Sequence, residues 1–599
     1  RIRGERADNL EEAIRHYELA LQVYTREAFP AQWATTQNNL ANAYLNRIRG
    51  ERADNLEEAI RHYELALQVY TVELWPDRAR TTARNLASAA EAHSDWLALH
   101  RALGLALRAA DHLFLQTVSA TGARVEADEL ARLANRDIAA CLQLVAQDPA
   151  IGREVVVTAE AARSRASLRE IGLGEFSPPP DVPADLVARE SALRTQLREV
   201  VESLSSIDTH ADRATEIERT LVARRAALTR DLEQVWSEML LTAPDSRDYV
   251  ALRRGDTPTW DDLQHLATRL GREAALVEFH NLEDRIVVII WRAGWDTPRL
   301  VVIPLGQREL FQRYLLPYER EILNRHVLKS AKRAPLHDWQ QLGEVLLAPL
   351  DEAIGDARLV YFIPHGNLHL IPLHALTVNG EPFIARRAVA YAPSAAALAR
   401  TLESAHGEQI IPAGDAILVM GVVFEQEAVD IACHFKVSAL IGAAANRAAL
   451  AQRAAAASII HLSCHGQFNA EDALDSAVLL ANGPFTARDW MRLRLKADLV
   501  TLSACQLGIS ERNPGDDLVG MARALMYAGA SSLLLTLWSV RADTTKDWML
   551  DFYQRVWKTP HAGKSQPEAY AVREATLALR AANPDPYVWA PFVLIGNWR

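Results

Sequence analysis

Hydrophobic positions recur with two different periods along this chain, and the change of period divides it in two. Up to about Leu241, apolar residues stand three and four positions apart, as in Ala59, Tyr63 and Ala66, which predicts amphipathic helices. Beyond that point, short β-rich runs alternate with helical segments, which is typical of a mostly parallel sheet with crossover helices. We expect strands at 275–279, 286–291, 300–303, 359–363, 416–420, 458–463, 499–503 and 532–537.

A sequence of 25 residues occurs twice, at 1–25 and again at 47–71, which is an offset of 46 (47 minus 1). The similarity continues beyond the identical block, because 39–41 (Asn-Leu-Ala) is matched by 85–87. Each unit predicts two amphipathic helices, and such units stack into a solenoid. Since a stack usually needs about three units or more, we expect further copies before Arg1 and treat the chain as N-terminally truncated.

Composition divides the helical part further. The repeats occupy 1–95, and 96–177 continues as helix without the repeat signature, which indicates a cap or spacer. A Pro-rich linker at 178–183 stops the helix. Charged amphipathic segments at 184–244 predict a helical hairpin, and we interpret it as a packing spacer rather than a dimerising coiled coil because the heptad pattern is short. The α/β domain then spans 245–599.

The overall composition is that of an ordinary folded protein, with 49% hydrophobic and 24% charged residues. A formal net charge of -11 argues against direct nucleic-acid or anionic-membrane binding by the whole chain, so we expect protein partners. Four cysteines cannot form a disulfide framework, which favours a reducing cytoplasm. The longest apolar stretch is far shorter than the roughly 20 residues of a membrane helix, so we expect no membrane association.

Two of the predicted strands lead to residues that can react. The strand at 458–463 leads to His465, and the strand at 499–503 leads to Cys505. Ligands of open α/β sheets bind beyond the carboxyl ends of the strands, where both residues fall. A cysteine nucleophile needs a nearby base, because an unperturbed thiol with a pKa of about 8.5 is only slightly ionised at neutral pH. The spacing of 40 residues (505 minus 465) leaves room for one crossover unit between adjacent strands.

Strand alternation separates the residues around this histidine onto two faces. His461, Ser463 and His465 share one face, while Cys464 points to the other face and into the core. The same alternation argues against a metal site made of His461, Cys464 and His465. A second group of histidines, which we expect to make structural hydrogen bonds rather than to bind a metal, consists of His365, His369 and His374. We therefore expect no metal and no cofactor.

The repeat unit is similar to the tetratricopeptide repeat. Residues 56–67 resemble the second helix of that repeat, and 39–44 resemble its first. The usual period is about 34 residues, and the extra length here lies largely in the polar connection 47–55, which indicates a long-loop variety. HEAT-like pairing, whose period is closer to that of this chain, is the alternative.

Several ordered motifs mark the C-terminal part. They are His-Leu-Ser-Cys-His-Gly at 461–466 and Leu-Ser-Ala-Cys at 502–505, together with segments at 364–376, 391–394, 515–530, 536–540 and 592–598. This set resembles the CHAT domain, the caspase-like domain associated with tetratricopeptide repeats, over roughly residues 250–599. The resemblance implies a caspase-like α/β/α sandwich with a mostly parallel sheet, preceded by the all-α solenoid.

The resemblance also implies an activity, that of a cysteine peptidase of the caspase, separase and gingipain group. His465 matches the catalytic histidine of the family and Cys505 its nucleophile. The backbone N–H groups of Gly466 and Cys505 match its oxyanion hole. No third member of a triad is evident, and this group of peptidases is generally described as using a dyad.

The pocket for the substrate residue before the cleaved bond is less well marked. Candidate residues are Ser503, Asp472, Asp475, Asp516 and Asp517. Asp516 and Asp517 precede an apolar helix, so capping of that helix is the competing interpretation. Metacaspases, which prefer basic residues, carry an acidic residue two positions before the nucleophile. Ser503 stands there in this chain, which weakens the case for a basic substrate residue.

The sequence therefore predicts a regulated cysteine endopeptidase that cleaves a specific protein partner. Its repeats would recruit the substrate or a protein activator, in a setting such as bacterial defence or cell-death signalling that the family resemblance suggests. Autoinhibition and an oligomeric state are both left open. The alternative is a non-catalytic binding scaffold whose caspase-like domain is inert.

Overall fold

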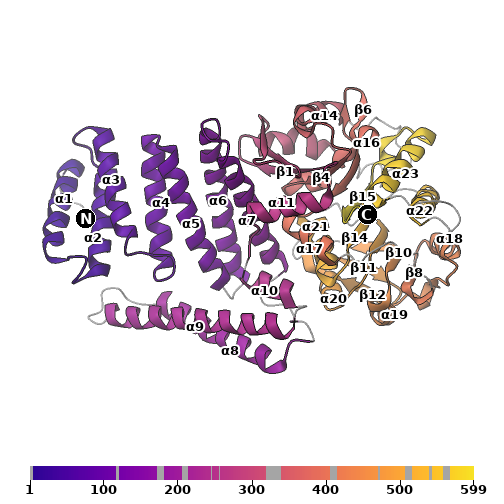
Figure 1. The fold of residues 1–599 in the computed structure, drawn as a ribbon, viewed down its shortest axis with the longest axis horizontal. Coiled ribbons are helices and arrows are strands. Elements are labelled where there is room, and N and C mark those ends of the chain that lie inside the picture. Colours follow the sequence, from indigo (N-terminus) through magenta and orange to yellow (C-terminus); the bar gives the residue numbers. More distant parts are fainter. Residues whose placement is uncertain are drawn as a thin grey trace. The chain divides into compact units, whose positions relative to one another are not determined.

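The computed structural model describes residues 5–116, 120–171, 178, 181–205, 214–243, 246–254, 256–318, 339–404, 414–467, 469, 473–505, 516–538, 542–557 and 567–599 (Figure 1). The chain forms two compact units, Arg1–Thr257 and Pro258–Arg599. The regular secondary structure described in the first unit is helical, and the second unit is built on a large sheet. The expected order of an all-α region followed by an α/β domain is therefore confirmed.

The helices of the first unit pack in chain order. Each of α1 to α7 lies against the next one, because short connections make consecutive helices neighbours (Figure 1). Their bounds are α1 (Arg6–Val23), α2 (Pro30–Leu45), α3 (Arg52–Leu67), α4 (Pro76–His93), α5 (Trp96–Gln116), α6 (Ala120–Leu144), α7 (Ile151–Ile171), α8 (Ala184–Ser205), α9 (Ala214–Thr242) and α10 (Arg247–Arg254).

Proline and alanine shape the repeats. Pro30 and Pro76 are the first residues of α2 and α4, a position where the missing N–H of proline breaks no hydrogen bond. Fully buried Ala34 and Ala66 let α2 and α3 approach closely beside the buried ring of Tyr70. Small residues at the contact thus set the spacing of neighbouring helices.

Helices α8 and α9 form a long pair of their own within the first unit. Buried Leu197 and Val200 of α8 pack against Leu228 of α9. Figure 1 shows this pair lying alongside the row formed by α1 to α7. The guanidinium of Arg225 on α9 donates a 2.9 Å hydrogen bond to the carbonyl of Leu74, which joins the pair to the repeats. The leucine stripe of 184–244 therefore serves packing within the unit.

The second unit contains a sheet of 13 strands in the order β12-β11-β10-β13-β14-β15-β7-β4-β1-β2-β3, with β8 beside β10 and β9 beside β8. The strands are β1 (Ala274–Asn281), β2 (Ile286–Trp291), β3 (Arg299–Ile303), β4 (Leu359–Ile363), β7 (Ala388–Tyr391), β8 (Ile417–Gly421), β9 (Leu440–Ile441), β10 (Ile459–Gln467), β11 (Ala477–Leu480), β12 (Gly483–Thr486), β13 (Leu499–Cys505), β14 (Ser532–Thr536) and β15 (Phe592–Gly596). A separate pair consists of β5 (Thr377–Val378) and β6 (Glu381–Pro382).

All eight expected strands are present, with small shifts at their ends.

The sheet is parallel at its centre, where β8, β10, β13 and β14 pair. It is antiparallel along β1-β2-β3, along β10-β11-β12 and between β14 and β15. The sheet is therefore mixed, and the candidate reactive residues lie in its parallel part. The strands β7, β11, β12 and β15 were not expected, because runs of only four or five residues do not distinguish a strand from a helix turn or a loop.

Helices cover both faces of this sheet, as a three-layer sandwich requires. Their bounds are α11 (Trp260–Leu270), α12 (Gln307–Glu309), α14 (Trp339–Leu346), α15 (Asp351–Ile354), α16 (Phe383–Arg386), α17 (Ala395–Ser404), α18 (Glu425–Phe435), α19 (Arg447–Arg453), α20 (Ala487–Met491), α21 (Asp516–Ala528), α22 (Ala542–Val556), α23 (Glu568–Ala582) and α24 (Pro586–Trp589). On one face, a core that includes Ile460, Leu462 and Cys464 packs against α14, α19, α20 and α21. The opposite face of β10 meets α18 and α22. Cys464 is buried in the core, as strand alternation predicts.

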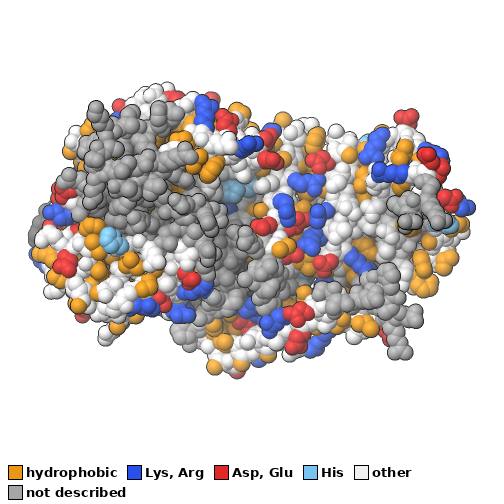
Figure 2. Space-filling model, turned by 180° about the vertical axis from the view of Figure 1, so that it is seen from behind, with side chains coloured by type: hydrophobic (Ala, Val, Ile, Leu, Met, Phe, Trp, Pro, Cys, Tyr) orange, Lys and Arg blue, Asp and Glu red, His pale blue; other side chains and the backbone are white. Residues whose placement is uncertain are grey.

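Figure 2 shows basic, acidic and hydrophobic side chains interspersed over the described surface of one face of the molecule. Within the part of the chain that the structure describes, no helix has both the length and the apolar composition needed to cross a bilayer.

Candidate active site

The two residues expected to react are neighbours in the sheet. β10 and β13 are adjacent parallel strands, and their register pairs His465 with Cys505. Adjacent strands are about 4.8 Å apart, so the backbone positions of the two residues adjoin. His465 is exposed, which leaves its imidazole accessible to a substrate. The side chain of Cys505 lies outside the described residues, and its place is given by the last position of β13.

The start of α18 packs on the imidazole of His465. Phe424, the residue before this helix, meets the imidazole edge-on with 5.9 Å between the ring centroids. T-shaped contacts of this kind contribute about 0.5–1.5 kcal/mol beyond the area they bury. The contact covers one side of the imidazole and limits its rotation.

A buried polar network surrounds His461 and Ser463, the two polar residues that precede His465 on the same face of β10. His461 Nε2 lies 3.1 Å from Glu427 Oε1 and 3.0 Å from the hydroxyl of Ser463. That hydroxyl donates to the same Glu427 oxygen at 2.9 Å. His461 Nδ1 lies 2.9 Å from the hydroxyl of Tyr553, which donates to Thr501 Oγ1 at 2.8 Å. Burial raises the pKa of Tyr553 far above its usual range, so its hydroxyl stays neutral.

These side chains depend on one another because all five residues are buried. A buried polar group that loses its partner costs about 1–3 kcal/mol. Glu427 comes from α18 and Tyr553 from α22, while the other three residues belong to β10 and β13. The network therefore fixes two helices on the strands that carry His465 and Cys505.

Three further contacts hold α18 in place, one with β8 and two with α22. A Cβ at Gly421 would lie 2.7 Å from the Cβ of Ala428, so only glycine at the end of β8 permits this close approach. Asp430 forms a 3.2 Å ion pair with Lys546 of α22. The ring of Phe435 lies 5.1 Å from that of Tyr553. With both of its ends held, α18 presents Phe424 to His465 in a defined position.

Gly466 and Ser503 flank the candidate pair within the sheet. Gly466 is buried in β10, in register with Val478 of β11. Ser503 is 4% exposed and in register with Ser463, two positions before Cys505. Ser503 therefore lies below the candidate pair rather than on the outer surface.

Of the four acidic candidates for the substrate pocket, Asp475 is the one whose side chain the structure describes. Asp475 ends the short turn η9 (Ala473–Asp475) and forms a 3.1 Å ion pair with Arg488. Asp516 and Asp517 are the first two residues of α21, and their side chains lie outside the described residues. Asp472 also lies outside the described residues.

The histidines of 364–376 separate in the structure. His365 Nδ1 accepts a 2.9 Å hydrogen bond from the backbone N–H of Asn281. His374 Nδ1 lies 2.8 Å from the hydroxyl of Tyr391, and burial lowers the pKa of His374 to about 3. These contacts tie the segment after β4 to β1 and β7, which agrees with the expected structural hydrogen bonding.

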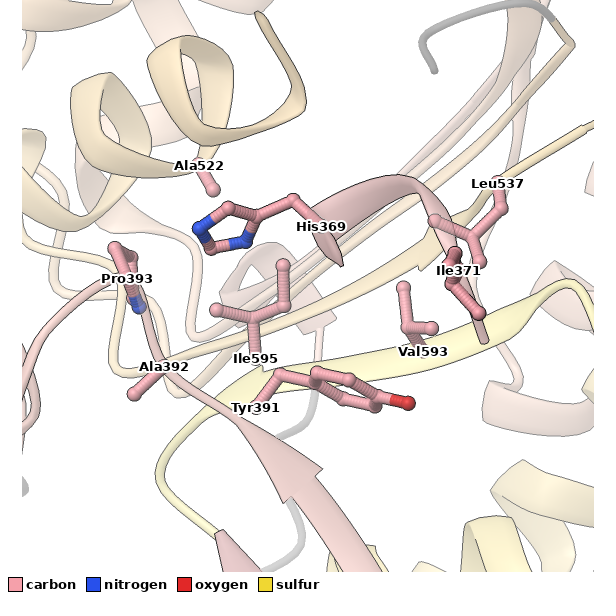
Figure 3. Close-up of a pocket in the computed structure, with 9 residues that line it drawn as sticks. All are labelled: His369, Ile371, Tyr391, Ala392, Pro393, Ala522, Leu537, Val593 and Ile595. Atoms are coloured by element: carbon pink, nitrogen blue, oxygen red, sulfur yellow. The ribbon is translucent and has the colours of Figure 1, made fainter. Parts of the chain in front are cut away.

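His369 lines a small cavity of about 20 Å³. Figure 3 shows its imidazole between Ala522 of α21 and Ile595 of β15, with the ring of Tyr391 below Ile595. A cavity of this size holds about one water molecule, so it is too small for a peptide substrate.

Phe424, Glu427, Thr501 and Tyr553 were not expected from the sequence. Glu427 lies on an amphipathic helix beside exposed Glu425, so its sequence context is that of a solvated charge. A signal for the network did exist, because His461 and Ser463 are polar residues on one face of an otherwise apolar strand. Buried polar groups need partners, and these partners had to come from the helix layer above.

Comparison with known proteins agrees with the motifs. Residues 337–597 match the family model of the CHAT domain, a match that covers less than half of the chain and confirms the expected resemblance. The repeats are similar to Tetratricopeptide repeat protein 28 of Mus musculus, with 36% identity over 112 residues, which is 19% of this chain and 4% of that protein. The same protein of Homo sapiens is 31% identical over 112 residues, with the same coverage.

Among solved structures, the chain is similar to a chain in crystal structures of the Saccharomyces cerevisiae separase-securin complex. The TM-score is 0.40 at 10% sequence identity, and the similarity covers 98% of this chain and 53% of that chain. The chain thus spans about half the length of this structure and a small fraction of the curated relatives it matches.

Proposed function

We propose that this chain, whose residues 337–597 match the CHAT domain, is a cysteine endopeptidase that cleaves a specific protein partner. Cys505 is the nucleophile and His465 its acid and base. The register that pairs these two residues carries the proposal. It brings the backbone positions of a histidine and a cysteine together at the carboxyl ends of adjacent parallel strands, where ligands of α/β sheets bind.

The reaction proceeds through a thioester. His465 takes the proton of the Cys505 thiol, and the thiolate attacks the carbonyl carbon of the scissile bond. The backbone N–H groups of Gly466 and Cys505 hold the oxygen as it becomes negative, at about 3–4 kcal/mol for each donor. His465 gives its proton to the leaving amine as the C–N bond breaks. Water then loses a proton to His465, hydrolyses the thioester and releases the carboxylic acid and the free thiol.

Helix α18 supports this role of His465. Phe424 covers one side of the imidazole, and Glu427 anchors the helix through Ser463 and His461. Glu427 is thus a positioning residue, which acts on the imidazole through the placement of α18.

The proposal is tested by a search for new protein N-termini in cells that express the chain, under a matched trigger such as phage infection. Cleavage products should appear with the wild type and disappear with Cys505→Ala and His465→Ala. The matched control is Cys433→Ala, which removes an exposed thiol on α18, and it should cleave like the wild type.

A second measurement separates an absent trigger from an absent activity. A peptide-like electrophile should label Cys505 selectively, and the label should be lost in Cys505→Ala. Neither new N-termini nor selective labelling would contradict the peptidase and support the binding scaffold.

We place this activity in the cytoplasm, in bacterial defence or cell-death signalling, with the repeats recruiting the substrate or a protein activator. The paucity of cysteine and the family resemblance support this setting. A cytoplasmic peptidase must be restrained, so the purified chain should cleave proteins only after an activator is added. Free cleavage of native and denatured proteins by the purified chain would contradict this regulation.

A further inference from the structure

We propose that the helical unit binds a divalent transition-metal ion, Zn²⁺ by the chemistry of its ligands, through His100, Asp137 and Cys141. One donor atom of each residue, an imidazole nitrogen, a carboxylate oxygen and a sulfur, lies within 4.8 Å of the other two. In the described part of the chain, this is the one group of three or more such residues that comes together in this way. The site is independent of the proposed peptidase, because it lies in the other unit.

Two adjacent helices bring the three residues together. Asp137 and Cys141 are four positions apart on α6, which sets them on one face one turn apart. His100 comes from α5, which packs against α6. The sequence offers no spacing signal for this group, because two ligands on one helix and one on another follow no short motif.

The distances converge on one nitrogen atom. His100 Nδ1 lies 2.8 Å from Asp137 Oδ1 and 3.3 Å from Cys141 Sγ. A protonated nitrogen carries a single hydrogen, which it can direct at only one of these two atoms. A zinc ion with bonds of about 2.0–2.3 Å would instead satisfy all three, because tetrahedral ligands at those lengths are about 3–4 Å apart.

The charge of the cluster also suits a cation. Asp137 is 1% exposed and Cys141 is fully buried, so an anionic form of either needs a positive partner. Zinc is coordinated by the thiolate and by a ring nitrogen that carries no proton, so metal binding must release the proton of the thiol.

An open cavity gives the ion a way in. It has a volume of about 530 Å³ and is lined by His100, Asp137, Glu154 and Thr158, among others. The Thr158 hydroxyl donates to Asp137 Oδ2 at 3.3 Å, which orients the carboxylate toward His100. Water that enters through this cavity would provide the fourth ligand.

The test uses the full chain carrying Cys505→Ala, so that the thiol of the proposed active site cannot contribute. After removal of metal by a chelator, Co²⁺ is titrated and its thiolate charge-transfer absorption is recorded, followed by competition with Zn²⁺. We expect one thiolate-bound Co²⁺ per chain, displaced by Zn²⁺. Adding Cys141→Ser should abolish the absorption, and adding Cys433→Ser should leave it unchanged. Thr158→Val should weaken the affinity about tenfold.

A second readout does not depend on a ligand variant. In moderate urea, Zn²⁺ should slow alkylation of Cys141 about tenfold or more in the same chain, because binding to the folded state opposes opening. Alkylation of exposed Cys433 should not change. The proposal is overturned if no thiolate absorption appears, if the absorption persists in Cys141→Ser, or if Zn²⁺ leaves the alkylation rate of Cys141 unchanged.

Discussion

His62 in the helical unit and His461 in the sheet unit are both buried, but the two histidines are held by different kinds of partner. His62 on α3 contacts Gln37 of the preceding helix, with 2.5 Å between Nδ1 and Oε1. His461 in the sheet contacts Glu427 and Tyr553, which are 34 and 92 residues away along the chain. A change at His62 therefore affects one helix pair. A change in the sheet network affects two strands and two helices beside the candidate reactive pair.

The identical repeats show how far position alone determines burial. α1 and α3 share their sequence, yet Tyr63 is fully buried and His62 is 6% exposed in α3. The counterparts in α1 differ, because Tyr17 is partly exposed and His16 is exposed. α3 packs between α2 and α4, whereas the described contacts of α1 are with α2. The same residue thus contributes differently to stability according to the helices beside it.

The largest effect is expected in the sheet network. Glu427→Ala removes the buried carboxylate that His461 and Ser463 share, so it should lower the free energy of unfolding by about 3 kcal/mol. It should also lower kcat of peptide cleavage about 10²-fold with little change in KM, because α18 no longer holds His465 in place. Steady-state kinetics and urea denaturation measure the two effects.

The control lies on the same helix, where Glu425→Ala removes an exposed carboxylate and should change neither quantity. Glu427→Gln, which keeps the shape and one acceptor oxygen, should recover part of kcat. A loss of stability in Glu427→Ala without any loss of kcat would show that the network does not position His465.

The next largest effect on stability is expected at the matching tyrosines of the two repeats, Tyr63 and Tyr17. Tyr63→Ala removes a buried ring and its 2.7 Å hydrogen bond to Asn42, and should cost about 3–4 kcal/mol. Tyr17→Ala should cost less than about 1 kcal/mol, because that ring is already partly in water. Urea denaturation of the two variants provides the measurement. Equal costs would mean that the burial of α3 is not what distinguishes the repeats.

A pH effect should follow from His62. Burial lowers its pKa to about 4, and Arg61 donates to its Nε2, which keeps the folded form neutral. The unfolded chain takes up a proton near the usual pKa of about 6.5, so the unfolded state binds more protons between these values. Stability is therefore complete above about pH 6.5 and is lost as the pH falls toward 4, by about 2 kcal/mol at pH 5.

Thermal unfolding at pH 7 and pH 5 measures this loss. His62→Gln should reduce the difference between the two pH values, whereas His16→Gln, at the matching exposed position, should leave the difference as it is in the wild type. An unchanged pH dependence in His62→Gln would assign the effect to other groups.

The smallest effect concerns an ion pair that recurs between the repeats. Arg47 binds Glu11 through two hydrogen bonds of 2.9 and 2.8 Å, while the matching pair of His93 and Glu57 is 3.8 Å apart. Glu11→Gln should cost about 0.5–1 kcal/mol, and Glu57→Gln should have no measurable effect. The difference should become smaller in about 1 M salt, where the Debye length falls to about 3 Å. A difference that is not reduced at high salt would indicate packing rather than charge.

The placement of His465 and Cys505 could be predicted from the sequence. Both residues follow apolar strands, and the carboxyl ends of neighbouring parallel strands meet at one edge of a sheet. In the backbone register of β10 and β13, His465 is paired with Cys505. The position of Ser503 could not be predicted in the same way. A strand residue can line a pocket or lie beneath it, and the side chains packed over the strand decide which of the two occurs.

The sequence by itself determined the features that depend on local order along the chain: the repeat, the helical periodicity, the eight expected strands and the motifs at the ends of β10 and β13. Only the tertiary structure decided which polar side chains became buried and with which partners. Glu427 became part of a buried network, and Glu425 two residues earlier stayed exposed. His100, Asp137 and Cys141 met only when α5 packed on α6. Burial depends on what the fold places over a residue, and a residue's neighbours in sequence do not contain that information.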